Sequence, residues 1–156
     1  MSAAKAACKK CDSEVRVEAL PGVTGNEGGV TVVFTKLPVL ACARGHRQFV
    51  NREFPVKLLD QLSRSVQLPS AKAKGLLVKR HYCGACGAEL ASESASRTYG
   101  SDVNLSGVEP FRVDLTVPVY ACPSCSREQV RSLDEVSRYV PAAMARAFQN
   151  AEIPPG

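Results

Sequence analysis

Short stretches of the chain alternate apolar and polar residues, which is the pattern of half-buried β-strands. Residues 14–18 alternate in this way, residues 30–35 are rich in β-branched and aromatic side chains, and residues 111–119 give the longest alternation. Glycines in residues 25–29 indicate a turn before the second of these stretches. The pattern predicts a chain built mainly from short strands.

A first stretch with helical spacing follows Pro55, a residue favoured at the first position of a helix. Its apolar stripe is predicted to face the core of the protein, and it consists of Val56, Leu59, Leu62 and Val66. A second helix is predicted from residues 132–135, because Ser-Leu-Asp-Glu is a capping-box pattern. We expect Pro141 to kink this helix or split it, and residues 151–156 to form a loose tail.

All seven cysteines lie in one spacing pattern that occurs twice, and one of the two histidines completes it. The first ligand set is Cys8, Cys11, Cys42 and His46, and the second is Cys83, Cys86, Cys122 and Cys125. Two thiolates separated by two residues can bind one ion, and a second such pair closes a tetrahedral site. The spacing therefore predicts two structural zinc ions per chain.

His46 is the least regular of these ligands. Residues 37–42 match residues 117–122 at an offset of eighty, and at that offset Gly45, not His46, matches Cys125. We predict that His46 completes the first site, because three cysteines alone would leave zinc with an open position. His81 has no vacancy to fill, so we predict that it is not a ligand.

The eighty-residue repeat, with one ligand set in each copy, predicts the domain organisation. The expected fold is small, β-rich α+β, with two tandem zinc-ribbon modules that each consist of a β-meander followed by a helix. The expected boundaries are 1–68 for the first module, 69–75 for a linker and 76–156 for the second module. Modules of this size bury little apolar surface and usually need a metal or a disulfide to fold.

The same residues allow three alternatives to two separate zinc sites. Iron in the second site stays open, because its Cys-Gly-Ala-Cys-Gly and Cys-Pro-Ser-Cys segments resemble the knuckles of rubredoxins. Disulfides are disfavoured by the odd cysteine count. A RING-like cross-brace is rejected, because thirty-six residues separate His46 from Cys83.

Charge is distributed unevenly along the chain, whose formal net charge is +5. Residues 1–75 hold twelve Lys/Arg and six Asp/Glu, while residues 76–156 hold eight and nine. A basic first module could bind phosphate groups, which makes nucleic acid a possible partner. The candidate contacts are Lys9, Lys10, Arg44 and Arg47.

Enzymatic activity is not predicted. Catalytic zinc keeps an open coordination position, whereas both ligand sets look closed, and the chain has no Gly-rich phosphate loop and no HExxH motif. The first residues lack the apolar core of a signal peptide, and no later run is long enough to span a membrane. Free thiolate ligands suit a reducing compartment, so we expect a cytoplasmic protein.

Residues 80–140 resemble the YgiT-type zinc finger of MqsA-like antitoxins. The resemblance rests on Cys83 to Cys86, the strand at residues 111–120, Cys122 to Cys125, and the acidic helix start at residues 133–135; residues 5–66 resemble it more loosely. In that family the finger binds a protein toxin and a separate helix-turn-helix domain reads DNA. No helix-turn-helix pattern is present here, so the resemblance implies at most the protein-binding half.

These observations lead to two functional hypotheses. The first is a non-enzymatic zinc protein that acts as a protein-interaction or regulatory adaptor module. The second is a zinc-ribbon protein that binds DNA or RNA through the basic first module. The sequence does not name the partner or the oligomeric state.

Overall fold

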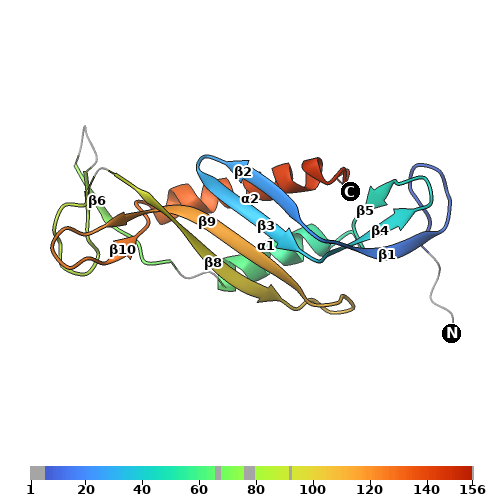
Figure 1. The fold of residues 1–156 in the computed structure, drawn as a ribbon, viewed down its shortest axis with the longest axis horizontal. Helices are drawn as coiled ribbons and strands as arrows, with labels where there is room; N and C mark the ends of the chain where they lie inside the picture. The colour runs from blue at the N-terminus through green and yellow to red at the C-terminus, as the bar shows by residue number, and fades with distance from the viewer. Residues whose placement is uncertain (1–5, 66–67, 76–79, 92, 156) are drawn as a thin grey trace.

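The computed structural model describes residues 6–65, 68–75, 80–91 and 93–155. These residues form a β-rich α+β fold with antiparallel sheets and two helices (Figure 1), which confirms the β-rich α+β part of the predicted fold class. In chain order the elements are β1 (Val15–Leu20), β2 (Val23–Glu27), β3 (Val30–Thr35), β4 (Leu37–Cys42), β5 (Arg47–Gln48), α1 (Phe54–Ser65), β6 (Lys72–Lys74), β7 (Arg80–Tyr82), β8 (Ala95–Val103), β9 (Phe111–Ala121), β10 (Glu128–Gln129) and α2 (Leu133–Asn150).

The largest sheet joins strands from both copies of the repeat. Its order is β10-β9-β3-β2, and β8 pairs with β9 along the edge opposite to β3. The joining ladder between β3 and β9 is antiparallel and runs from the pair Thr31–Thr116 to the pair Thr35–Arg112. Residues 1–68 and 76–156 each keep their own ligand set, but they share this sheet.

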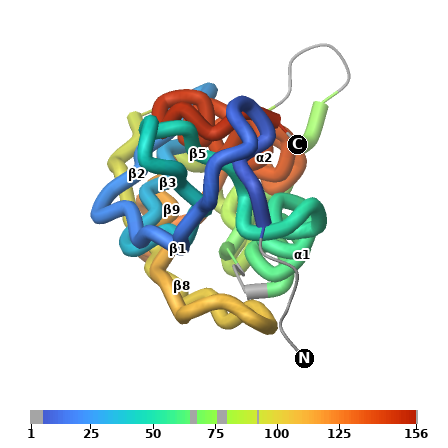
Figure 2. Tube along the Cα trace, turned by 90° about the vertical axis from the view of Figure 1, so that its right-hand side faces the viewer, coloured from blue at the N-terminus to red at the C-terminus, as the bar shows by residue number. Residues whose placement is uncertain are grey.

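One apolar core lies between this sheet and the two helices, which cover the same face of the sheet (Figure 2). The alternation predicted for residues 111–119 is confirmed, because every second side chain of β9 from Phe111 to Val119 is buried. Phe34 of the first copy stacks on Phe148 of the second, with ring centroids 5.5 Å apart. The core is therefore common to both copies.

The buried face of α1 differs from the predicted stripe. Phe54, Leu58 and Leu62 point into the core, at a spacing of four residues, whereas 72% of Val56 is exposed. Both the stripe that starts at Val56 and the face that starts at Phe54 are apolar, and packing against the sheet selects the face with Phe54. Val66 lies outside the described residues.

The second helix follows the predicted cap but not the predicted break. The Ser132 hydroxyl accepts a hydrogen bond from the Glu135 N–H, as the capping box requires. The helix continues through Pro141, so it is not split. The expected loose tail is also wrong for its first residues, because Ile153 donates its N–H to the Phe148 carbonyl and is buried in the core.

The predicted turn at residues 25–29 is shorter than expected. Gly25 lies within β2, and the turn is made by Gly28 and Gly29, which both have positive φ angles of 58° and 83°. Glycine adopts this conformation without the steric cost that a side chain would bring. Gly25 has a different role, because a Cβ there would collide with the backbone of α2 at Ala143 and Ala147.

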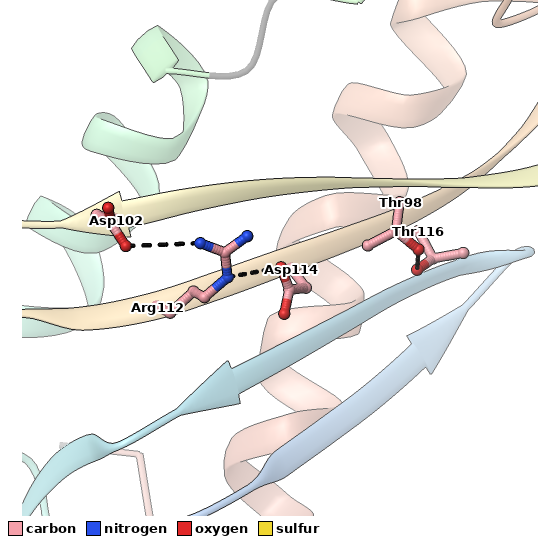
Figure 3. Close-up of polar contacts among 5 residues, drawn as sticks. All are labelled: Thr98, Asp102, Arg112, Asp114 and Thr116. Carbon is pink, nitrogen blue, oxygen red and sulfur yellow. Dashed lines mark hydrogen bonds and ion pairs between the residues drawn. The ribbon is translucent and has the colours of Figure 1, made fainter.

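Strands β8 and β9 carry polar contacts on the side away from the helices (Figure 3). Arg112 of β9 pairs with Asp102 of β8 at 3.7 Å and with Asp114 at 3.1 Å. Thr98 and Thr116, which lie directly opposite each other, form a hydrogen bond of 2.8 Å between their hydroxyls. The two cross-strand contacts, Arg112–Asp102 and Thr98–Thr116, favour the observed register of β8 on β9.

Smaller sheets occupy the two ends of the elongated molecule, with β1, β4 and β5 at one end and β6 and β7 at the other, where β10 of the large sheet also lies (Figure 1). Residues 69–75, predicted as a linker, contribute backbone pairing at the end that contains β6. β6 pairs with β7, and the Ala71 N–H donates to the carbonyl of the fully buried Val130. Residues 70–74 are therefore part of the fold.

Candidate metal centres

Each pair of candidate ligands lies on a knuckle, a tight loop that begins at Cys8, Cys42, Cys83 or Cys122. Three of the four knuckles form the same backbone hydrogen bonds. In the knuckle at Cys83, the Cys83 N–H donates to the Ala88 carbonyl, and the Cys83 carbonyl accepts from Gly87, whose φ is +80°. In the knuckle at Cys122 the acceptor is the Arg127 carbonyl and the left-handed donor is Ser126. In the knuckle at Cys8 the acceptor is the Ser13 carbonyl and the left-handed donor is Asp12. The left-handed residue reverses the chain, so both cysteines of a knuckle face one point.

The second ligand set comes together as predicted. The sulfur of Cys83 lies 3.7 Å from that of Cys125, and the sulfur of Cys86 lies 3.4 Å from that of Cys122. A tetrahedral zinc with Zn–S bonds of about 2.3 Å places its sulfurs about 3.8 Å apart. The four thiols therefore have the spacing that one zinc-sized ion requires, and all ligand atoms lie within 4.8 Å of one another.

The first ligand set also comes together, with His46 in it. The sulfurs of Cys11 and Cys42 are 3.8 Å apart, and the sulfur of Cys8 lies 3.5 Å from Nδ1 of His46. A tetrahedral zinc bound by sulfur and imidazole nitrogen would set the second distance at about 3.5 Å. The structure thus places His46 where the sequence argument put it, while His81 belongs to neither set.

The knuckle at Cys42 shows why the ligand changes from cysteine to histidine. It is one residue shorter: Gly45, with φ +84°, donates to the Cys42 carbonyl, and the Cys42 N–H donates to the His46 carbonyl. In its backbone hydrogen bonds His46 therefore corresponds to Arg127, which lies two residues after the ligand Cys125. The longer imidazole side chain reaches the site from there, and beyond this point the copies match at an offset of 81 residues.

Two buried glutamines connect the knuckles, and the sequence analysis missed both. Gln48 and Gln129 are the buried polar side chains of the described chain, and each follows the second knuckle of its site. The Gln129 carbonyl accepts from the Gly84 N–H at 2.9 Å, and the Gln48 carbonyl accepts from the Lys9 N–H at 3.0 Å. Each glutamine therefore bonds to the residue after the first cysteine of its site.

The two glutamines differ in what their amide groups donate to. The Gln129 amide donates to the Cys83 sulfur at 3.2 Å, whereas the Gln48 amide donates to the Ala7 carbonyl at 3.3 Å. A signal existed in the sequence, since both copies carry a glutamine after the second knuckle. An offset of eighty aligns Gln48 with Glu128, so the one-residue difference between the knuckles hid the match.

Hydrogen bonds favour the thiolate form of several ligands. The Gln129 amide, with backbone N–H groups of Cys86 and Ala85, lowers the pKa of Cys83 to about 5. Hydrogen bonds from the Ser13 side chain and backbone, with a further one from His46, lower the pKa of Cys11 to about 6. A thiolate is the form that binds metal, so these ligands are prepared for an ion near neutral pH.

Other ligands keep their protons more tightly. Burial raises the pKa of Cys8. At Cys125 the Arg127 backbone hydrogen bond lowers the pKa, but burial and the neighbouring thiols of its own site outweigh it and raise the pKa to about 11. A metal ion must displace these protons, so binding of the ion should become weaker as the pH falls.

The basic residues considered for nucleic acid surround the first site. Lys9, Lys10 and Arg44 are exposed, while Arg47 is half-buried and donates to the Ala151 carbonyl at 2.8 Å. Arg47 therefore ties β5 to the end of α2. The structure leaves three of the four candidate side chains open to solvent.

An apolar groove runs between α1 and α2. It contains two adjoining hollows of about 290 and 370 Å³, and Leu59 and Pro141 line both. Val56 lines one hollow and Leu133 the other, and these are two of the three large hydrophobic side chains that the described chain exposes. The stripe that was expected to form core thus partly borders an open groove.

No protein-family model, curated protein or solved structure matches this chain. The resemblance to the YgiT-type zinc finger therefore stays a prediction. Neither of the described helices combines the length and the apolar character that crossing a membrane would require.

Proposed function

We propose that each end of the protein is a zinc-ribbon-like unit with one structural zinc ion, and that the protein acts without catalysis as an interaction module for another protein. The geometry of the two ligand sets carries the first half of this proposal. Each set offers four protein ligands at tetrahedral spacing, and sites with four protein ligands are structural because no position is left for substrate.

Metal content per chain tests this assignment. Protein purified without added metal should contain two zinc ions, and the variants Cys11→Ser and Cys86→Ser should contain one each, because each loses a ligand from a different set. Elemental analysis by mass spectrometry measures this. A red protein with iron in the second site, or a wild-type content of one ion, would refute the assignment of zinc to both sites.

The groove between α1 and α2 supports a protein as the partner. Its lining is apolar, and Val56 and Leu133 at its borders are exposed. The charged residues of α1 already form ion pairs, Lys57 with Glu53 just before the helix at 3.0 Å and Arg64 with Asp60 at 3.2 Å. The groove therefore offers hydrophobic burial to a partner without unpaired charges on α1 beside it.

Nucleic acid is the second candidate, favoured by the exposed Lys9, Lys10 and Arg44 beside the first site. Single-stranded nucleic acid is usually held by aromatic side chains that stack on bases, in addition to basic residues. The chain has nine aromatic residues, and none of them is exposed. The observations therefore favour the protein partner.

Two variants with opposite expectations separate these candidates. Val56→Glu combined with Leu133→Glu places charge in the groove, and Lys9→Glu combined with Lys10→Glu reverses the basic surface. Quantitative affinity purification from the native host should recover partners with the second variant that are lost with the first. Binding of labelled RNA or DNA that weakens between roughly 50 and 200 mM salt and disappears in the lysine variant would instead establish nucleic-acid binding.

A further inference from the structure

β1 is an edge strand, and some of its backbone N–H and C=O groups face away from its sheet. β1 is the first strand of the sheet β1-β4-β5, and its ladder with β4 runs from Val15–Cys42 to Leu20–Leu37. Within the described residues, the outer edge meets another segment only at the bridge between Ala7 and Glu14. Residues 16–19 of this edge are exposed to solvent, whereas Leu20 at its end is buried.

The hydrogen bonds of β4 show which residues of β1 face outward. Backbone groups alternate in direction along an antiparallel strand, and the Cys42 N–H donates towards β5, to the His46 carbonyl. The backbone of Ala41 therefore faces β1, where it lies opposite Arg16. It follows that Arg16 and Glu18 bond to β4, while the N–H and C=O of Val17 point away from the sheet.

The side chains at the centre of this edge are exposed, and their charges would match those of a second, antiparallel copy of the same edge. Val17 is 67% exposed, and it lies opposite Leu40 on one face of the sheet. Arg16 and Glu18 are exposed on the other face, and neither forms an ion pair within the described chain. They carry opposite charges at equal distances on either side of Val17.

We propose that this edge pairs with the same edge of a second copy of the chain, antiparallel and centred on Val17. The two Val17 residues then exchange both backbone hydrogen bonds, and Arg16 of each copy lies opposite Glu18 of the other. An edge with charges of one sign repels its copy, but here the two-fold axis brings opposite charges together twice. The two small sheets become one sheet of order β5-β4-β1-β1-β4-β5.

A charge-swap series measured by light scattering tests this dimer. The metal-loaded wild type should have twice the mass of one chain. Arg16→Glu should halve that mass, because it places like charges opposite each other, and the double variant Arg16→Glu with Glu18→Arg should restore it. Unchanged metal content and circular dichroism in all three proteins show that the fold is kept.

Three results would overturn the proposal: a wild type that remains a monomer at every concentration tested, a dimer that Arg16→Glu leaves intact, or a double variant that stays a monomer. The second result would place the dimer contact elsewhere on the molecule. The third would show that Arg16 and Glu18 do not face each other across the axis.

A cysteine crosslink gives an independent measurement of the register. Opposed residues of a hydrogen-bonded antiparallel pair have Cα atoms about 5.5 Å apart, within the range of about 4.4–6.8 Å that a disulfide spans. Val17→Cys should therefore form a covalent dimer under mild oxidation of the zinc-loaded protein. Val56→Cys is the matched control, because it is similarly exposed, at 72%, but lies on α1; equal crosslinking of both variants would contradict the proposed register.

Discussion

At the scale of single residues, the candidate metal ligands are held in place by side chains outside the two ligand sets. Gln129 spans the second site, since it accepts from the Gly84 N–H and donates to the Cys83 sulfur. Groups that orient metal ligands contribute strongly to affinity although they do not touch the ion. Gln48 holds the corresponding place at the first site but makes no bond to a sulfur.

Gln129→Leu should therefore weaken the second site alone. Loss of a group that orients a ligand typically lowers metal affinity about 10- to 100-fold, and the first site in the same molecule serves as an internal control. Titration with a chromogenic chelator should show one ion released earlier than in the wild type. Early release of both ions, or of neither, would contradict a site-specific role for Gln129.

The pH dependence of this variant has a definite sign. The Gln129 amide lowers the pKa of Cys83 to about 5, so removing it raises that pKa towards the ordinary thiol value. Protons then compete with the metal at higher pH. The second ion should leave Gln129→Leu at a higher pH than it leaves the wild type, whereas Gln48→Leu should not change the release pH of the second ion.

At the scale of elements, a glycine allows β2 and α2 to approach each other closely. Gly25 of β2 faces α2 so closely that an added Cβ would meet the carbonyl of Ala143 and the backbone of Ala147. Backbone atoms cannot rotate away as a side chain can. β2 and α2 must therefore separate to accept any side chain at this position.

Gly25→Ala should destabilise the metal-loaded protein by about 1–3 kcal/mol, the usual cost of forcing extra atoms into a packed interior. Gly22→Ala is the control, because a Cβ there meets no atom within 4 Å. Urea denaturation followed by circular dichroism measures both. A Gly25→Ala protein as stable as the control would mean that β2 and α2 pack less closely than described.

Element prediction succeeded where the pattern was local and failed where packing chose between alternatives. The strand at residues 111–119 was predicted because one side of it is buried along its whole length. The α1 stripe was predicted in part: Leu62 is buried and Leu59 packs against the core, but Leu58 is buried in place of Val56, and only contact with the sheet decides between those two. The predicted split at Pro141 is wrong, because α2 continues through that residue and buries side chains on both sides of it, Val136 before and Ala143 after.

At the scale of the whole molecule, the repeat does not correspond to two separate cores. β3 of the first copy pairs with β9 of the second, and Phe34 stacks on Phe148 across the same division. A core shared in this way buries more apolar surface than two modules of half the size could. The strands next to the two candidate metal sites, β4 and β5 for the first and β10 for the second, lie towards opposite ends of the molecule (Figure 1).

Fragments 1–75 and 76–156 should therefore fail to fold separately, even with zinc. Each would expose the side of β3 or β9 that normally pairs, together with half of the common core. Co-expression of the two fragments should restore a folded complex. Well-dispersed amide spectra from either fragment alone would contradict this prediction and favour independent modules.

The sequence by itself determined the ligand sets, the capping of α2 and the alternation of β9, because these follow from spacings of a few residues or from a repeat that the chain displays directly. Only the tertiary structure decided that the copies share one sheet, which helix face is buried, and which glutamines join the knuckles. Pairing between residues 31–35 and 112–116 depends on which surfaces bury each other best. No local pattern of apolar and polar residues records that choice.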